Sequence, residues 1–299
     1  MKRERGVDFM VFALCGGDAR TLRLTGMLVK DGHRVRTWAL EDAPAIAGVE
    51  VCASARECCA GAECVILPMP ATTKRGLLNA PYSSSPRCLG ELFASLDAGT
   101  LVLTGTVTKE LTALAEGAGV ELRGYGSTEL FRAANSLATA EGAIAVLLRE
   151  TEAVLCGAHA VIIGAGAITR ALAPRLYSLG VSTTIASRDA AKRAWYAAMG
   201  LDTVDTSLLA TALSDAQIVI NTAPSLVLTA SRLTELPEGA LVLDLASAPG
   251  GTDFDAARAY GIKAVTAPGL PGKYAPQTSA QAVRDAVYKI LEDERLGKS

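Results

Sequence analysis

A glycine turn between a buried strand and a helix constrains this chain more than any other segment. Ala160-Val161-Ile162-Ile163 is an unbroken apolar run, which is typical of a strand buried on both faces. Gly164-Ala165-Gly166 follows it, and Ala167-Ile168-Thr169 opens a helix predicted to reach Leu179. A strand, a glycine turn and a helix in this order predict the start of a dinucleotide-binding βαβ unit.

Each glycine has a distinct task in such a turn. The first permits the tight bend, and the second lets the backbone approach a pyrophosphate, which the helix N-terminus then binds through its N–H groups. We therefore predict that Gly164, Gly166, Ala167 and Ile168 bind a cofactor. Thr169 stands where a third small residue is usual, which predicts slightly looser helix–strand packing. A purely structural turn is the alternative.

The next strand of the unit ends at Ser187-Arg188, without a carboxylate at its tip. An acidic residue about 20 positions after the glycines would accept from a ribose 2′-hydroxyl. Arginine instead forks onto a 2′-phosphate, to which serine can also donate. We therefore predict NADP as the cofactor, with NAD as the alternative, and Asp189 as the cap of the following helix. An ordinary solvated arginine is the competing interpretation.

Further strands of this half are predicted to end in polar or proline-bounded turns at the same sheet edge. Ligands of open α/β sheets lie beyond the carboxyl ends of the strands. The predicted cofactor contacts at these ends are Asn221, Thr222, Ala223, Pro224, Ala246 and Pro268.

Apolar runs and amphipathic stretches alternate along the whole chain of 299 residues, half of which are hydrophobic. This alternation predicts an α/β fold with two doubly wound, parallel-sheet, Rossmann-like domains flanking a cleft. We expect a substrate or partner domain over residues 1–134 and a connecting helix over 135–152. An NADP-binding domain over 153–273 and a C-terminal helix over 274–299, returning to the first domain, complete the prediction.

Composition excludes several classes of protein. A net charge of −2 and the lack of an evident basic face argue against nucleic-acid binding. Because no apolar run is long enough for a bilayer, we expect a cytoplasmic protein without a membrane span. The seven cysteines include no Cys-x-x-Cys pair, so we expect no metal site and mostly buried thiols, a reactive thiol being the alternative. A homo-oligomer is left open.

The first half offers candidates for binding an anionic substrate. Gly16-Gly17-Asp18 precedes a predicted helix, and we expect backbone N–H groups there, with Arg20, to hold a carboxylate. A helix cap at Asp18 and a surface charge at Arg20 are an equally supported alternative. Thr72 and Thr73 offer hydroxyl groups at a possible helix N-terminus, and Asn135 is predicted to open the connecting helix. The substrate-binding candidates are therefore Gly17, Asp18, Arg20, Thr72, Thr73 and Asn135.

No catalytic residue can be assigned from the sequence. His33 stands beside Gly32 in a predicted turn, and His159 precedes a buried strand, so both are expected to be structural. Hydride transfer requires mainly that the cofactor and the substrate are oriented against each other.

Several motifs resemble one family across nearly the whole chain. They are Gly16-Gly17-Asp18-Ala19-Arg20, Ile66-Leu67-Pro68 with Ala71-Thr72-Thr73, the block Asp244–Phe254, and Ala267-Pro268-Gly269-Leu270-Pro271-Gly272. They resemble the dipicolinate synthase A subunits of spore-forming bacteria, and the Asp244–Phe254 block is the most specific of them.

The resemblance implies NAD(P)-dependent oxidation of a dihydrodipicolinate-level, dicarboxylate precursor from the lysine pathway to dipicolinate. It also implies a flavoprotein-like partner (the B subunit), a sporulation role in the mother cell, and kinship with alanine and shikimate dehydrogenases. Two alternatives stay open. One is a non-catalytic NADP-binding or scaffold subunit for the B subunit, and the other is a dehydrogenase of another small acid.

Overall fold

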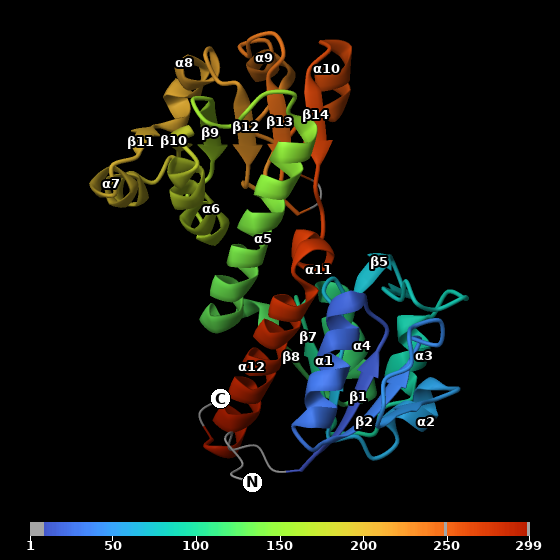
Figure 1. Ribbon diagram of the computed structural model, residues 1–299. Coiled ribbons are helices and arrows are strands. Elements are labelled where there is room, and N and C mark those ends of the chain that lie inside the picture. The colour runs from blue at the N-terminus through green and yellow to red at the C-terminus, as the bar shows by residue number, and fades with distance from the viewer. Residues whose placement is uncertain (1–8, 248–249, 298–299) are drawn as a thin grey trace. The chain divides into compact units, whose positions relative to one another are not determined.

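The computed structural model describes residues 9–247 and 250–297. The chain divides into two compact units. Unit 1 holds Met1–Asn135 and Ala275–Ser299, and unit 2 holds Ser136–Tyr274. Figure 1 shows that a parallel sheet with helices around it forms the centre of each unit.

Unit 1 is built on a six-stranded sheet whose neighbouring strands are all parallel. Its inner strands are apolar and fully buried, as a sheet covered on both faces requires. In spatial order the strands are β3 (Val49–Val51), β2 (Arg34–Trp38), β1 (Val11–Cys15), β4 (Cys64–Ile66), β7 (Leu101–Thr104) and β8 (Glu121–Gly124).

Helices cover both faces of this sheet. The helices α1 (Ala19–Lys30) and α12 (Pro276–Arg295) lie side by side over one face, where they share an apolar core cluster with the sheet. A second core cluster lies on the other face. The remaining elements are α2 (Ala55–Cys59), a hairpin of β5 (Thr72–Lys74) and β6 (Leu77–Leu78), α3 (Leu89–Ala94), α4 (Lys109–Ala118) and the 3₁₀ turn η1 (Tyr125–Ser127).

Unit 2 repeats the same strand order in a second parallel sheet of six strands. Counted along the chain within each six-stranded sheet, both sheets have the order 3-2-1-4-5-6, which is that of dinucleotide-binding folds. The strands are β11 (Asp202–Val204), β10 (Ser182–Ala186), β9 (His159–Ile163), β12 (Ile218–Asn221), β13 (Leu241–Asp244) and β14 (Lys263–Thr266).

The longest helix, α5 (Glu129–Glu150), passes from unit 1 into unit 2. Its residues Ala140, Ala143 and Leu147 are buried in the core of unit 2. The other helical elements of this unit are α6 (Ala167–Ser178), α7 (Ala190–Ala198), η2 (Thr206–Leu208), α8 (Leu209–Leu213), α9 (Ala230–Leu233), α10 (Phe254–Ala259) and α11 (Leu270–Tyr274).

The predicted pair of doubly wound parallel sheets is confirmed, but two local predictions are wrong. The connecting helix begins at Glu129, so Asn135 lies inside the helix rather than at its start. Thr128 is the reason, because its hydroxyl oxygen accepts from the Phe131 N–H at 3.2 Å. The segment after Pro68 forms the β5–β6 hairpin and not a helix N-terminus.

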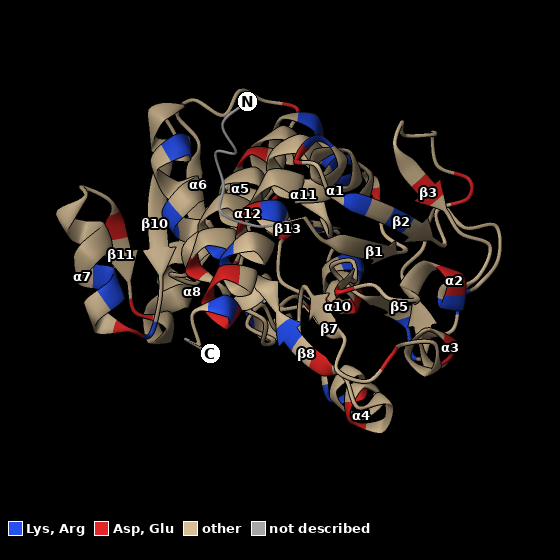
Figure 2. Ribbon diagram, turned by 90° about the horizontal axis from the view of Figure 1, so that it is seen from below, with Lys and Arg blue, Asp and Glu red and all other residues tan. Residues whose placement is uncertain are grey.

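Figure 2 shows basic and acidic residues interspersed along the helices and strands of both units. Within residues 9–247 and 250–297, no helix is both long and apolar enough to cross a bilayer.

A buried polar chain ties α12 to the sheet of unit 1. His33 Nδ1 accepts from the Met10 N–H at 3.3 Å, and His33 Nε2 lies 3.0 Å from the Tyr288 hydroxyl. That hydroxyl donates to Asp31 at 2.8 Å. The neutral ring satisfies these contacts, since its Nδ1 is an acceptor, and protonation would remove the bond from Met10.

We predict that the free energy of unfolding decreases as the pH falls below neutrality, and that His33 contributes to this decrease. Burial lowers the pKa of His33, against Asp31 and Glu63, which raise it. Because the unfolded chain binds the proton more readily, this contribution is complete above the unfolded pKa of about 6.5 and is lost as pH falls through the lower folded pKa. Denaturant titrations from neutral to mildly acidic pH should show a smaller decrease in His33→Gln; an unchanged decrease would contradict the prediction.

Candidate functional site

The glycine turn of unit 2 lies at the carboxyl end of β9, where the strand order of the sheet reverses between β9 and β12. Gly164 has φ of +107°, which disfavours any residue with a side chain, and its N–H donates to the Ala186 carbonyl at 2.9 Å. A Cβ atom on Gly164 would stand 2.3 Å from Thr222 Oγ1. The turn therefore requires glycine at this position for two independent reasons.

Gly166 leaves the start of α6 open. It caps the helix without a side-chain hydrogen bond, and a Cβ atom built on it would meet nothing within 4 Å. The first N–H groups of a helix have no partner inside the helix, and they carry the positive end of its dipole. Ala167 and Ile168, both half-buried, supply these groups here. This arrangement suits the binding of a phosphate group.

Thr169 strengthens the turn. Its side chain is fully buried, and its hydroxyl donates to the Gly164 carbonyl at 2.8 Å. The Thr222 hydroxyl donates to the Ile163 carbonyl at 2.9 Å and lies 3.4 Å from the Thr169 hydroxyl. The predicted loosening at Thr169 is therefore wrong, since its extra atoms form a hydrogen bond within the turn.

The end of β10 presents an unpaired arginine. Arg188 is exposed, and it has no hydrogen bond or ion pair with any residue that the structure describes. Ser187 is buried, and its hydroxyl oxygen accepts from the Asp189 N–H at 3.2 Å. Asp189 caps α7 as predicted, and the Lys192 N–H lowers the pKa of its carboxyl. The carboxylate of Asp189 is thus held at the helix, while the guanidinium of Arg188 remains available.

The loops after β12 and β13 are joined by a buried network that the sequence did not reveal. The Asn221 amide donates to the Ala223 carbonyl and to Asp244 Oδ1, both at 3.0 Å. Asp244, only 1% exposed, also accepts from the Ala246 and Gly251 N–H groups, both at 2.9 Å. The side chain of Asn221 therefore holds the loops in place, and the atoms that a ligand can reach lie elsewhere in them.

The remaining predicted cofactor contacts also follow strand ends at this edge of the sheet. Thr222 and Ala223 follow β12 and are half-buried, and Pro224 after them is exposed. Ala246, half-buried, follows β13, and Pro268, exposed, follows β14.

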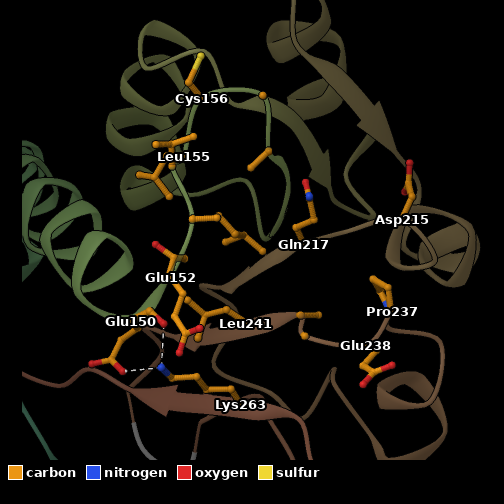
Figure 3. Close-up of a pocket in the computed structure, with 18 residues that line it drawn as sticks. Glu150, Glu152, Leu155, Cys156, Asp215, Gln217, Pro237, Glu238, Leu241 and Lys263 are labelled. Carbon is orange, nitrogen blue, oxygen red and sulfur yellow. Dashed lines mark hydrogen bonds and ion pairs between the residues drawn. The ribbon is translucent and has the colours of Figure 1, made fainter.

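A hollow of unit 2 lies at the edge of the sheet opposite to the glycine turn, at the amino ends of the strands (Figure 3). It has a volume of about 1010 Å³ and is lined by residues 150–158 and by the starts of β12, β13 and β14. At its rim Lys263 donates to the Glu150 carbonyl at 2.7 Å and forms an ion pair with the Glu150 carboxylate at 3.2 Å. This hollow does not include any predicted cofactor residue.

In unit 1 the corresponding glycine turn is closed by the protein itself. The Gly16 N–H donates to the Trp38 carbonyl at 2.8 Å, and the Gly17 N–H donates to the Asn79 carbonyl at 2.7 Å. A Cβ atom on Gly16 would stand 2.7 Å from the same Asn79 oxygen. The prediction that the N–H of Gly17 holds a substrate carboxylate is therefore wrong, because the segment after β6 occupies that place.

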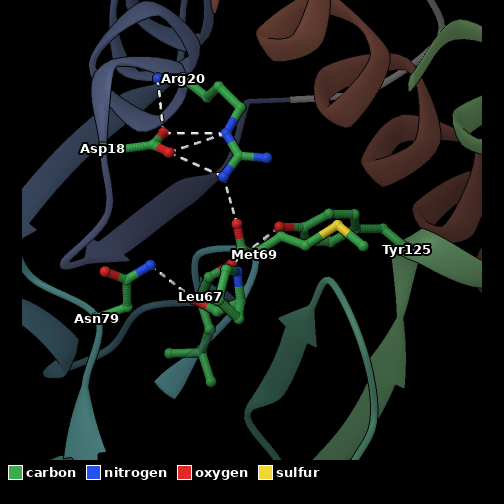
Figure 4. A network of polar contacts seen from close by, with 7 residues as sticks. Asp18, Arg20, Leu67, Met69, Asn79 and Tyr125 are labelled. Atoms are coloured by element: carbon green, nitrogen blue, oxygen red, sulfur yellow. Dashed lines mark hydrogen bonds and ion pairs between the residues drawn. The ribbon is translucent and has the colours of Figure 1, made fainter. Parts of the chain in front are cut away.

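Asp18 and Arg20 form a compact pair at this turn, as Figure 4 shows. Asp18 caps α1 by accepting from the Arg20 N–H at 2.9 Å, and its carboxylate contacts the guanidinium at 2.8 Å. The guanidinium also donates to the Met69 carbonyl, and the Arg20 side chain is only 11% exposed. The alternative prediction of a helix cap at Asp18 is therefore confirmed. Its second part, a solvated surface charge at Arg20, is wrong.

Beside this pair lies a cavity of about 20 Å³, enough for a single water molecule. Tyr125 lines it; its hydroxyl donates to the Leu67 carbonyl at 3.1 Å, and burial raises its pKa. The other substrate candidates do not line this cavity. Thr72 is half-buried and Thr73 is exposed, and both lie on β5, whose pairing with β6 is irregular between Thr72 and Lys74. Asn135 is half-buried within α5.

Comparison with known proteins gives one family. Residues 11–125 match the family model for the N-terminal domain of the dipicolinate synthase A subunit. The chain is 33% identical over 232 residues to the dipicolinate synthase A subunit of Bacillus subtilis (strain 168), which covers 77% of each chain.

Two solved structures of such A subunits share the fold over nearly their whole length. The Bacillus halodurans structure has a TM-score of 0.87 at 29% identity, covering 94% of this chain and 97% of that one. The Bacillus subtilis structure has a TM-score of 0.86 at 29% identity, covering 97% and 98%. An L-alanine dehydrogenase, with a TM-score of 0.63, 16% identity and coverage of 94% and 89%, shares the fold alone.

We predict opposite effects from alanine at the two glycines of the unit 2 turn. Gly166→Ala should leave the melting temperature unchanged, because its φ of −90° suits alanine and the space beside it is open. It should weaken binding of a nicotinamide dinucleotide by about 1–3 kcal/mol, since the new methyl group stands where phosphate approaches the helix. Calorimetric titration measures this.

Gly164→Ala should instead destabilise unit 2 itself, by about 1–3 kcal/mol from the backbone conformation alone, with the contact to Thr222 in addition. Thermal unfolding measures this loss. Unchanged dinucleotide affinity in Gly166→Ala would contradict the proposed placement of the phosphates.

Proposed function

Because this chain belongs to the family of dipicolinate synthase A subunits, we propose that it is an NADP-dependent oxidoreductase subunit that forms dipicolinate from a dihydrodipicolinate-level precursor. The observation that carries this proposal is the open N-terminus of α6 at Gly166, at the point where the sheet order reverses. That is where folds of this topology bind the pyrophosphate of a dinucleotide.

The choice of NADP rests on the end of β10. Arg188 is exposed and unpaired within the described residues, and the adjacent carboxylate, Asp189, is engaged in capping α7. A free guanidinium binds a phosphate monoester through paired, charge-assisted hydrogen bonds. A ribose 2′-hydroxyl would instead need the acidic residue that this strand lacks.

The reaction needs little from the side chains of the protein. Bound NADP⁺ supplies a hydride acceptor. A dihydropyridine dicarboxylate that loses one hydride and one proton becomes aromatic, so the proton is lost with a large driving force and water suffices as its acceptor. The residues of this chain then have to bind and orient the two partners and exclude competing reactions.

The side chain of Arg20 supports our proposal that unit 1 binds the dicarboxylate substrate. Its Nε and Nη2 atoms bond to Asp18 and Met69, whereas no bond from Nη1 to another described residue is found. Figure 4 shows this nitrogen directed away from both partners. We propose that Nη1 contacts a substrate carboxylate while Asp18 fixes the plane of the guanidinium.

A second function is favoured by the positions of the two histidines. His33 directly precedes β2, and His159 begins β9, so both lie at the amino ends of strands, away from the dinucleotide edge. In this alternative the chain takes no part in hydride transfer and is a non-catalytic NADP-binding or scaffold subunit for a flavoprotein-like B subunit. In both cases we propose a role in sporulation, in the mother cell.

We predict that Arg188→Ala weakens binding of NADP by about 1–3 kcal/mol, the range for hydrogen bonds to charged groups, and leaves NAD binding nearly unchanged. Fluorescence titration with NADPH and NADH measures both affinities. Arg258→Ala, at an arginine that is also exposed but lies on α10, is the control and should change neither. Equal losses for the two cofactors would refute the 2′-phosphate contact.

We predict that this chain, together with NADP⁺ and a B subunit, forms ultraviolet-absorbing dipicolinate from the lysine-pathway precursor. Arg20→Lys should lower kcat/KM by a factor that corresponds to about 1.5–3 kcal/mol of lost transition-state stabilisation. The reason is that lysine has no planar guanidinium to share between Asp18 and a carboxylate. Arg23→Lys, at the exposed arginine one turn later on α1, should have no effect.

Absence of dipicolinate with either nicotinamide cofactor would reject the dehydrogenase assignment. Full turnover in a folded Arg20→Lys variant would instead favour the non-catalytic role of this chain.

A further inference from the structure

Three buried thiols converge beneath the glycine turn of unit 1. Cys15 is the last residue of β1, and Cys58 and Cys59 are the last two residues of α2, which packs against β1 and β2. All three are at most 1% exposed, and their sulfur atoms lie within 4.8 Å of one another. The Sγ atoms of Cys15 and Cys59 are 4.0 Å apart. The sequence could not show this cluster, because Cys15 is 43 positions from Cys58.

We propose that Cys15, Cys58 and Cys59 form a trithiolate site for a soft monovalent cation, Cu(I). The spacing of the sulfur atoms supports this proposal. With a metal–sulfur bond of about 2.3 Å, three sulfurs in a plane around one ion stand about 4.0 Å apart. The observed Cys15–Cys59 distance equals this value, and small side-chain rotations bring the third sulfur to it.

The surroundings favour Cu(I) over zinc. Thiolate ligands select soft cations, but structural zinc is nearly always held by four ligands. No fourth histidine, cysteine or carboxylate among the described residues joins the three sulfurs. Cys52, in the same core cluster, contacts Cys58 and donates its thiol to the Glu50 carbonyl, but its sulfur is not part of the group whose sulfur atoms lie within 4.8 Å of one another. The three cysteines belong to a core cluster of buried apolar residues.

The three thiols contact one another before any ion binds, since the Sγ atoms of Cys15 and Cys59 are within hydrogen-bond distance. Arg36 lies near them and donates to the Ala60 carbonyl directly after Cys59. A cation that binds all three sulfurs displaces the thiol protons, and the positive charge of Arg36 offsets part of the negative charge that remains.

Access requires only a local opening. The helix α2 has five residues, and the segments Ala53–Ser54 and Ala60–Gly61 on either side of it are exposed. Short elements with exposed ends open at a low cost in free energy. Since Gly16 directly follows Cys15, a bound ion would also fix the base of the Gly16–Gly17 turn.

The test uses the full-length chain with the exposed Cys88 and Cys156 replaced by serine, reduced and kept free of oxygen. Titration with Cu(I) against the chelator bicinchoninate should show one tightly bound ion per chain. Cys59→Ser and Cys15→Ser should weaken this binding by more than the ~100-fold that removal of an outer-sphere contact can cost. Cys64→Ser is the matched control, because this thiol is equally buried but belongs to the core on the other face of the sheet.

X-ray absorption on the Cu(I)-loaded parent chain needs no substitution in the core, so this measurement tests the proposal even if a serine variant fails to fold. Three sulfur ligands at about 2.3 Å would support the site. The proposal is overturned if fewer than three sulfurs are found, if folded Cys59→Ser binds Cu(I) as tightly as the parent, or if Zn²⁺ binds as tightly as Cu(I). None of these results depends on the dinucleotide site in unit 2.

Discussion

The contact between Gly164 and Thr222 is the constraint on which the proposed dinucleotide site depends. A side chain on Gly164 would collide with the Thr222 hydroxyl, which is itself bonded to the Ile163 carbonyl at the end of β9. Thr169 closes the turn from the helix side by bonding to the Gly164 carbonyl. These hydrogen bonds join the carboxyl ends of β9 and β12 to the start of α6. The free N–H groups of α6 consequently have a fixed direction before any ligand binds.

The two units have the same strand order, but the glycine turn is open in unit 2 and closed in unit 1. Both sheets have the same strand order, and both have a glycine turn after the first strand. In unit 2 the space beside Gly166 is open. In unit 1 the Asn79 carbonyl accepts from Gly17, and Asp18 pairs with Nε and Nη2 of Arg20, so these groups are not open to a pyrophosphate. This difference favours a dinucleotide on unit 2, whereas for unit 1 we propose a smaller ligand at Nη1 of Arg20.

Much of the fold could be predicted because its signals are local. The apolar strands and the helices α1 and α6 follow directly from periodicity and glycine position. The three-residue edge strands β3 and β11 carry too little pattern to be recognised. The start of α5 was missed because its cap at Thr128 precedes the apolar stripe.

The candidate site divides in the same way. The turn glycines and Arg188 are visible in the sequence, whereas the partners of Gly17 and Asn221 depend on long-range contacts.

Hydrogen–deuterium exchange with and without NADP⁺ tests the central claim, that the turn and Arg188 bind this cofactor. The account predicts slower exchange at Ala167–Thr169 and around Ser187–Arg188, with little change in the hollow at residues 150–158. Unchanged exchange at Ala167–Thr169 under saturating NADP⁺ would contradict it.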